Sequence, residues 1–150
     1  MVPFDQIFDV LRKGGADVGL IIHEGQLTYA RDGFRLMVDF GAWWKKKTGL
    51  PLPLGGNVIL KSLGEKKMKT ISTILSASIR YGLDHMDEAM PHLKAYARDL
   101  DDSLTRRFVK MYVNDYTVDY GETGRRAITE FLKAGAAEGF VPPIPNLEFV

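Results

Sequence analysis

Asp17-Val18-Gly19-Leu20-Ile21-Ile22-His23-Glu24-Gly25 has the pattern of a buried strand with a polar end. Its apolar run, residues 18–22, does not alternate with polar residues, which is typical of a strand that is buried on both faces. Ligands in open α/β sheets bind just beyond the carboxyl ends of strands. We therefore expect His23 to face a cleft, and it is the first candidate functional side chain. The alternative is a hydrogen-bonded structural histidine, which is the commoner role at such a position.

An amphipathic helix is predicted immediately before this strand, over residues 4–13. Its apolar side chains fall at helical spacing, and Gly14-Gly15 is a usual helix end. This helix, the glycine turn and the strand form half of a βαβ unit. The strand that should precede the helix is not in the sequence, so we expect the chain to begin in the middle of a fold.

Two further strands are predicted after His23, over residues 34–40 and 58–60. Residues 24–32 are predicted to be a loop or a short helix, and residues 41–47 a short helix that Thr48-Gly49 closes. The segment 50–56, Leu-Pro-Leu-Pro-Leu-Gly-Gly, cannot be helical, because each proline lacks a backbone donor and pushes the residue before it towards extended geometry.

From Glu65 onward the pattern is helical, and Asp101 or Asp102 is a plausible N-cap of the third helix. The four expected helices cover residues 65–83, 87–97, 101–114 and 122–137. The tail, residues 139–145, is expected to be extended and stiffened by its prolines. The predicted fold class is therefore α/β, with a strand-containing N-terminal third followed by a helical remainder.

Composition places the chain among ordinary single-domain globular proteins. It has 150 residues, of which 45% are apolar and 26% charged, and a net charge of +1. That charge gives no reason to expect binding to nucleic acid or to acidic membranes, and no apolar stretch approaches the roughly 20 residues of a membrane span. The absence of cysteine excludes disulfides and thiolate chemistry and suits a reducing, cytoplasmic compartment. No signal peptide is recognisable.

Common catalytic motifs are missing from the sequence. It contains no phosphate-binding loop, no dinucleotide fingerprint and no nucleophile elbow. The three histidines lack the spacing of a zinc site, so no metal site is expected, and His85 and His92 are interpreted as structural residues. The pair Asp101-Asp102 is interpreted as a helix cap and not as an acid/base pair.

Several segments together carry a family resemblance. They are Gly19-Leu20-Ile21-Ile22-His23-Glu24, Thr28-Tyr29, Asp39-Phe40-Gly41-Ala42-Trp43-Trp44 and Thr48-Gly49-Leu50-Pro51-Leu52-Pro53-Leu54-Gly55, with weaker agreement at Tyr112-Val113-Asn114 and Asp119-Tyr120-Gly121-Glu122. The sequence resembles the 1,4-dihydroxy-6-naphthoate synthase (MqnD) family of the futalosine route to menaquinone. The resemblance covers nearly the whole chain from Phe4.

The resemblance implies a two-lobed fold like that of periplasmic binding proteins, with the site between the lobes. Residues 1–56 would be part of the cleft lobe, and residues 57–150 a crossing strand and a helical region that packs on the other lobe. The implied reaction is that of a lyase, which converts cyclic dehypoxanthine futalosine to 1,4-dihydroxy-6-naphthoate and a three-carbon sugar fragment. No cofactor is implied.

The resemblance also implies that His23 is the general base. An imidazole with the ordinary pKa of ~6.5 can accept a proton near neutral pH. Glu24 either orients the imidazole or caps the segment that follows. Tyr29, Leu54 and Gly55, together with Glu24, are the expected substrate-binding residues.

The chain departs from the family in length, because members carry a similar length again before the point that corresponds to Met1. It is therefore expected to be a fragment, one part of a split enzyme that an N-terminal half completes, or a degenerate homologue. In each case the helices after Glu65 should expose apolar surface, which would favour association, including homo-oligomers. The alternative function is a non-catalytic module of the same fold that binds a small carboxylate, and an inactive fragment is the third possibility.

Overall fold

The computed structural model describes residues 2–95, 100–144 and 146–150. Within them every regular element is a helix. In chain order these elements are η1 (Phe4–Gln6), α1 (Ile7–Arg12), α2 (Gly25–Thr28), α3 (Phe40–Thr48), η2 (Lys61–Leu63), α4 (Glu65–Asp84), α5 (Met86–Lys94), α6 (Asp102–Tyr112), α7 (Asp115–Val118) and α8 (Gly121–Ala137). None of the described helices is long and apolar enough to cross a membrane.

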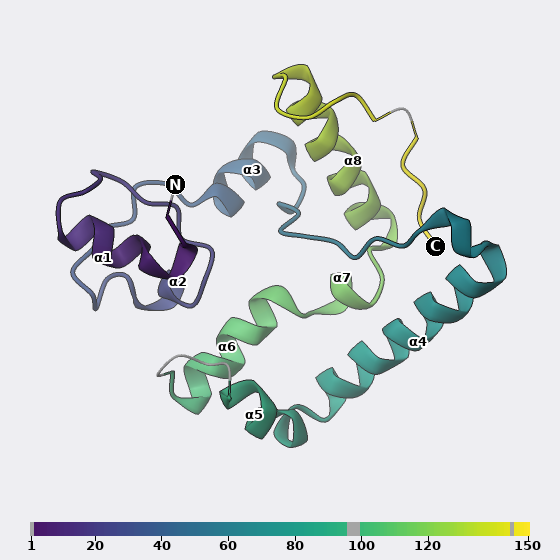
Figure 1. The fold of residues 1–150 in the computed structure, drawn as a ribbon, viewed down its shortest axis with the longest axis horizontal. Helices are drawn as coiled ribbons and strands as arrows, with labels where there is room; N and C mark the ends of the chain where they lie inside the picture. The colour runs from purple at the N-terminus through teal and green to yellow at the C-terminus, as the bar shows by residue number, and fades with distance from the viewer. Residues whose placement is uncertain (1, 96–99, 145) are drawn as a thin grey trace.

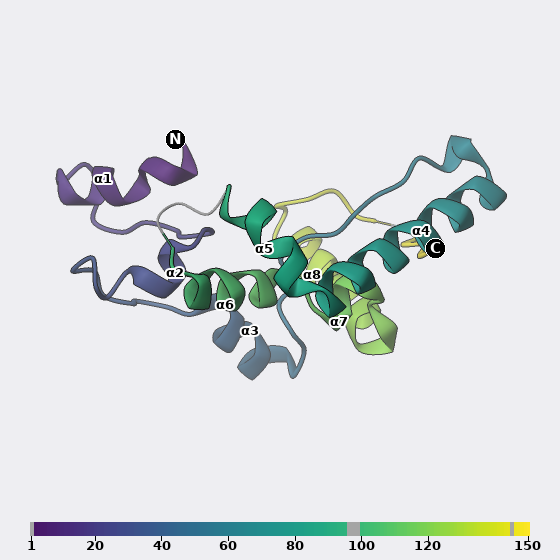
Figure 2. The same cartoon turned by 90° about the horizontal axis from the view of Figure 1, so that it is seen from below.

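The molecule is elongated, with its N-terminal segment at one end and α4 at the other (Figure 1). The second view shows the same separation of α1 and α2 from α4 (Figure 2). Helix α4 is tied to α7, because Oγ of Ser76 donates to the carbonyl of Val118 at 3.0 Å and Arg80 pairs with Asp115 at 3.3 Å. Helices α5 and α6 are joined by ion pairs between their side chains, among them Arg106–Asp87 at 2.5 Å.

The predicted α/β fold class is wrong, and so is the expected strand-containing lobe of a periplasmic-binding-protein-like fold. Residues 18–22 and 58–60 form irregular segments, residues 34–39 do the same, and Phe40 already begins α3. A strand needs a neighbour with which to exchange backbone hydrogen bonds, and no described segment supplies one. Most apolar side chains of these segments are exposed instead, including Val18 at 68% and Val58 at 98%.

The predicted helices are confirmed within a few residues of their ends. Helix α3 shows why: the side chain of Asp39 accepts a hydrogen bond from the amide of Ala42 at 2.9 Å, and Gly49 ends the helix with φ of +74°. The end of the helix expected over 87–97 and Pro145 of the tail lie outside the described residues.

The apolar core is small. Its buried members are Trp44, Leu50, Met90, Leu100 and Ala127. The ring of Trp44 meets the edge of the Phe131 ring, with centroids 5.3 Å apart, and so joins α3 to α8.

Helix α4 buries none of its residues, and Ile71, Ile74 and Tyr81 on it are 44%, 64% and 58% exposed. The apolar exposure predicted for the helices after Glu65 is therefore confirmed. Whether this surface causes association stays a prediction.

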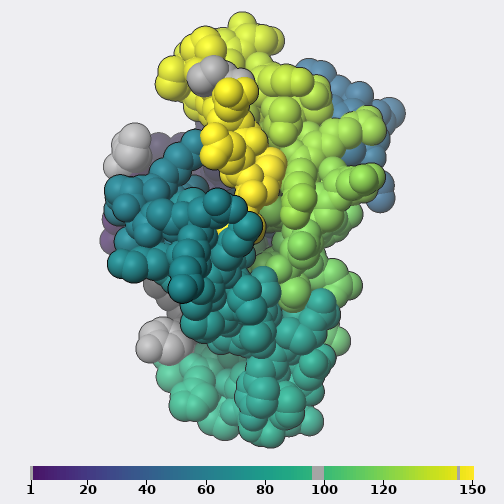
Figure 3. All heavy atoms as spheres, turned by 90° about the vertical axis from the view of Figure 1, so that its right-hand side faces the viewer, coloured from purple at the N-terminus to yellow at the C-terminus, as the bar shows by residue number. Residues whose placement is uncertain are grey.

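The C-terminal tail lies between α4 and α8 (Figure 3). Figure 3 shows its last residues (yellow) between the α4 segment (teal) and α8 (green). Glu148 pairs with Lys61 at 2.6 Å, and the carbonyl of Val150 accepts a hydrogen bond from Ser72 at 3.1 Å. The ring of Phe149 lies 5.9 Å from that of Tyr120. The tail thus links η2 and α4 to Tyr120, the residue that precedes α8.

Candidate active site around His23

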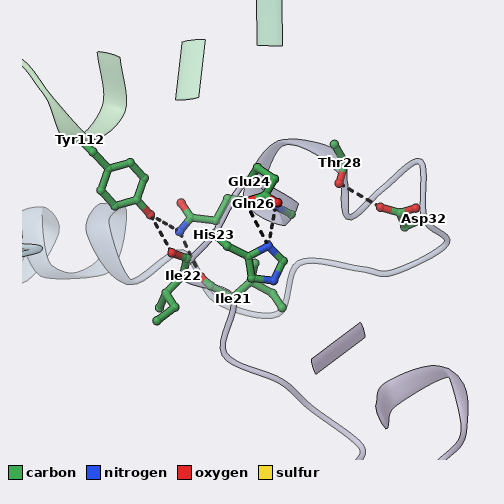
Figure 4. Close-up of polar contacts among 9 residues, drawn as sticks. Ile21, Ile22, His23, Glu24, Gln26, Thr28, Asp32 and Tyr112 are labelled. Atoms are coloured by element: carbon green, nitrogen blue, oxygen red, sulfur yellow. Dashed lines mark hydrogen bonds and ion pairs between the residues drawn. The ribbon is translucent and has the colours of Figure 1, made fainter. Parts of the chain in front are cut away.

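His23 lies where the irregular segment 17–22 turns into α2. The amide N–H of Gly25 donates to Nδ1 of His23 at 3.0 Å, and Oε2 of Glu24 lies 3.8 Å from the same nitrogen (Figure 4). The distance to Glu24 is too long for a hydrogen bond, and the two groups attract each other as charges only when the imidazole is protonated. The backbone turn at the start of α2 therefore sets the orientation of the imidazole.

Aromatic rings cover the imidazole. The side chain of His23 is only 11% exposed, and its ring centroid lies 6.0 Å from that of Phe4 and 5.5 Å from that of Phe8. Phe8 in turn stacks on Phe34 at 4.7 Å. The apolar face of the first helix, which the sequence predicts, thus packs over His23.

Gly25 is the residue that lets these rings come so close. A Cβ atom at this position would lie 2.7 Å from Cε1 of His23 and 2.7 Å from Cζ of Phe8. Such distances are shorter than carbon–carbon van der Waals contact. No larger residue fits here unless His23 and Phe8 move.

Nε2 of His23 is buried and has no hydrogen-bond partner within the described residues. Buried polar atoms are nearly always paired, so this one calls for an explanation. Because the Gly25 amide donates to Nδ1, the neutral ring carries its proton on Nε2. The neutral ring thus holds an unpaired N–H at Nε2, and a ligand atom would reach it only if the atoms that cover it moved.

Glu24 makes no capping hydrogen bond with its side chain, although it occupies the N-cap position of α2. Of the two roles open to it from the sequence, the capping role is absent here. Its Oε2 lies 3.8 Å from Nδ1 of the His23 imidazole.

Two side chains hold the His23 loop against the body of the protein. Nε2 of Gln26 donates to the hydroxyl of Tyr112 at 2.7 Å and to the carbonyl of Ile21 at 3.1 Å. The Tyr112 hydroxyl donates to the carbonyl of Ile22 at 3.4 Å (Figure 4). Sequence reasoning missed both roles, although Tyr112-Val113-Asn114 belongs to the segments that carry the family resemblance.

The other predicted site residues divide between two places. Leu54 and Gly55 line a cavity of about 500 Å³, which we call the tyrosine pocket because Tyr112, Tyr116 and Tyr120 form its opposite wall. His23, Glu24 and Tyr29 are not among its lining residues. Tyr29 stays half-buried in the N-terminal segment, where its amide donates to the carbonyl of Gly25 at 2.9 Å.

Comparison with known proteins places this chain in a family. A family model described as "Menaquinone biosynthesis" matches residues 1–137. A 1,4-dihydroxy-6-naphthoate synthase from Thermus thermophilus is 38% identical over 99% of this chain and 55% of its own length. One from Streptomyces coelicolor is 35% identical over 96% of this chain and 51% of its own length. The chain thus spans about half the length of these relatives.

A solved structure agrees with the fold described above. The crystal structure of protein AF1704 from Archaeoglobus fulgidus superposes with a TM-score of 0.89 at 36% identity, over 93% of this chain and 53% of that chain. The resemblance drawn from the sequence is confirmed by the family model and by the names of the relatives. This chain belongs to the menaquinone biosynthesis family that contains the 1,4-dihydroxy-6-naphthoate synthases.

Proposed function

We propose that this chain carries the proton-transferring residue of a lyase that converts cyclic dehypoxanthine futalosine to 1,4-dihydroxy-6-naphthoate in menaquinone biosynthesis. The observation that supports this most is Nε2 of His23, which is buried without a partner in the described residues. A histidine in such a place can transfer a proton to or from a bound substrate. The names of the relatives support the product of this reaction, 1,4-dihydroxy-6-naphthoate.

His23 acts as a general base at Nε2 only when that nitrogen has a lone pair. The neutral ring must then carry its proton on Nδ1, and the Gly25 amide can no longer donate to that atom. The Glu24 carboxylate, with Oε2 3.8 Å from Nδ1, is the group that would accept the Nδ1 proton in its place. In this proposal Glu24 orients the imidazole and selects the tautomer that serves as base.

We propose that a second segment or polypeptide, equivalent to the rest of the relatives, completes the site. The exposed apolar side chains of Val18 and Val58 and those along α4 support this, because large exposed apolar surfaces usually mark interaction sites. The groups that bind the substrate carboxylate would come from that partner.

A binding module without chemistry is the second candidate, and one observation favours it. As placed here, the neutral imidazole offers an N–H at Nε2, which suits a hydrogen bond to a bound carboxylate. A module of this kind would need no change of tautomer.

Replacing His23 separates the two functions. If the protein is a lyase, His23→Ala should lower turnover of cyclic dehypoxanthine futalosine by about 10²-fold or more, the usual contribution of a positioned proton-transfer group. The Kd for 1,4-dihydroxy-6-naphthoate should change much less. A variant that loses affinity for the naphthoate, from a parent protein with no turnover, would establish the binding module and contradict the lyase.

A further inference from the structure

The tyrosine pocket has the dimensions of a small-molecule site. One wall is the segment that contains Leu54 and Gly55, and the other comes from α6, α7 and α8. Its volume of about 500 Å³ lies within the range of ligand pockets, roughly 300–1,000 Å³.

Among the residues that the structure describes, no charged side chain lines this pocket. Its polar groups are neutral hydroxyls and amides, among them Tyr116, Tyr120 and Asn114, and the rest of its surface is apolar or aromatic. Burying a charged group here would leave it without a counter-charge, which is costly. Flat aromatic walls favour stacking or edge contacts with another aromatic ring. The lining of the pocket therefore suits a neutral, planar, aromatic part of a ligand.

Two glycines keep the pocket open beside the tyrosines. A Cβ atom at Gly56 would lie 2.9 Å from the Tyr120 hydroxyl, and one at Gly124 would lie 3.1 Å from Cδ1 of Tyr116. Both distances are at or below the limit of ordinary contact. The positions of both rings thus depend on the absence of a side chain at Gly56 and Gly124.

The pocket is connected to the His23 loop through one side chain. Tyr112 lines the pocket, while its hydroxyl contacts Gln26 at 2.7 Å and the carbonyl of Ile22 at 3.4 Å. Ile22 directly precedes His23. A ring that packs on Tyr112 therefore lies against the residue that fixes the position of the His23 loop (Figure 4).

We propose that the tyrosine pocket binds a neutral aromatic ring system of one or two fused rings. Resting on the proposed function, this ring is the aromatic part of the substrate, and Tyr112 positions the His23 loop relative to it. The carboxylate of that substrate then lies outside the pocket, where charged groups can reach it.

The test uses 2-naphthol, a neutral and fluorescent two-ring compound, titrated into the full chain. We expect saturable binding with one site per chain. Gly56→Ala should weaken binding by at least about fivefold, because the new methyl group would lie 2.9 Å from the Tyr120 hydroxyl and displace a ring that lines the pocket. Gly82→Ala is the matched control, since Gly82 lies outside the pocket and its Cβ would meet nothing within 4 Å. It should bind 2-naphthol as the parent does.

Tyr116→Ala provides a second variant if Gly56→Ala does not fold by circular dichroism. Tyr116 is 45% exposed, so its replacement leaves the buried core intact, and we expect weaker naphthol binding. Binding that is unsaturable, or unchanged in the folded pocket variants, would place naphthol on exposed apolar surface and overturn the proposal.

This test is independent of turnover. A chain that binds 2-naphthol in the pocket but never converts cyclic dehypoxanthine futalosine would overturn the lyase proposal and leave the pocket standing. Turnover without naphthol binding would overturn the pocket alone.

Discussion

The side-chain amide of Gln26 donates a 2.7 Å hydrogen bond to the hydroxyl of Tyr112, which lies 86 residues further along the chain. Together with the contact of Tyr112 to the carbonyl of Ile22, this bond joins the N-terminal segment to α6. Tyr112 therefore both lines the tyrosine pocket and contacts the loop that carries the candidate base. No other hydrogen bond or ion pair between residues 17–32 and α6 is observed among the described residues, so this pair should help to hold the His23 loop.

Tyr112→Phe keeps the ring in the pocket and removes only the hydroxyl. We expect the free energy of unfolding to fall by about 1 kcal/mol, the usual net value of a hydrogen bond. Amide hydrogen exchange at residues 21–26 should become faster, while exchange in α4 stays unchanged.

Tyr116→Phe is the control for this variant, because no hydrogen bond from the Tyr116 hydroxyl is observed among the described residues. If both variants alter exchange at residues 21–26 equally, the Gln26–Tyr112 bond does not hold the loop.

Gly25→Ala should disturb the site directly, because a Cβ atom would lie 2.7 Å from both the His23 and the Phe8 rings. We expect a loss of about 1–3 kcal/mol in urea denaturation, the usual cost of overpacking. The Cε1 proton resonance of His23 should shift as its ring moves.

Gly82→Ala adds the same methyl group in open space within a helix, so it should preserve or slightly raise stability. An equal loss of stability in both variants would mean that the fit around Gly25 is looser than described.

Asp101 caps α6, since its side chain accepts a hydrogen bond from the amide of Leu104 at 2.8 Å. Asp101→Ala should therefore lower the free energy of unfolding by about 1 kcal/mol, whereas Asp101→Asn should retain most of the cap. Thermal or urea denaturation of the two variants gives the comparison. Equal losses would indicate that the charge of Asp101, and not its capping bond, stabilises the helix.

The exposed apolar face of α4 should cause self-association. Ile74 is 64% exposed on this helix, so Ile74→Lys should shift the sedimentation equilibrium towards monomer and reduce binding of an apolar dye. Thr73→Lys adds the same charge at the neighbouring exposed position and serves as the control. A monomeric parent protein, or the same shift in both variants, would contradict a role for this face.

The sequence predicts local features of this protein far better than distant ones. The beginning of α6 follows from a capping residue, Asp101, whose hydrogen-bond partner lies three residues away. The amphipathic helix that carries Phe8 also follows from residue spacing. The packing of Phe8 over His23 does not, because the sequence pattern predicts that His23 faces a cleft.

The strands failed for a physical reason. An apolar run such as residues 18–22 indicates that its side chains favour burial. It does not indicate whether a neighbouring strand is present with which the run can pair. The Gln26–Tyr112 bond and the tyrosine pocket depend on contacts between residues far apart in sequence, so no local pattern could indicate them.

The decisive measurement is turnover of cyclic dehypoxanthine futalosine by this chain mixed with the part of the Thermus thermophilus synthase that it does not match, using parent and His23→Ala chains. Assembly of each mixture is checked by sedimentation. We predict that the parent mixture releases 1,4-dihydroxy-6-naphthoate and that His23→Ala lowers the rate by about 10²-fold or more. An assembled mixture in which His23→Ala is as active as the parent, or in which neither is active, would contradict His23 as the base of a lyase.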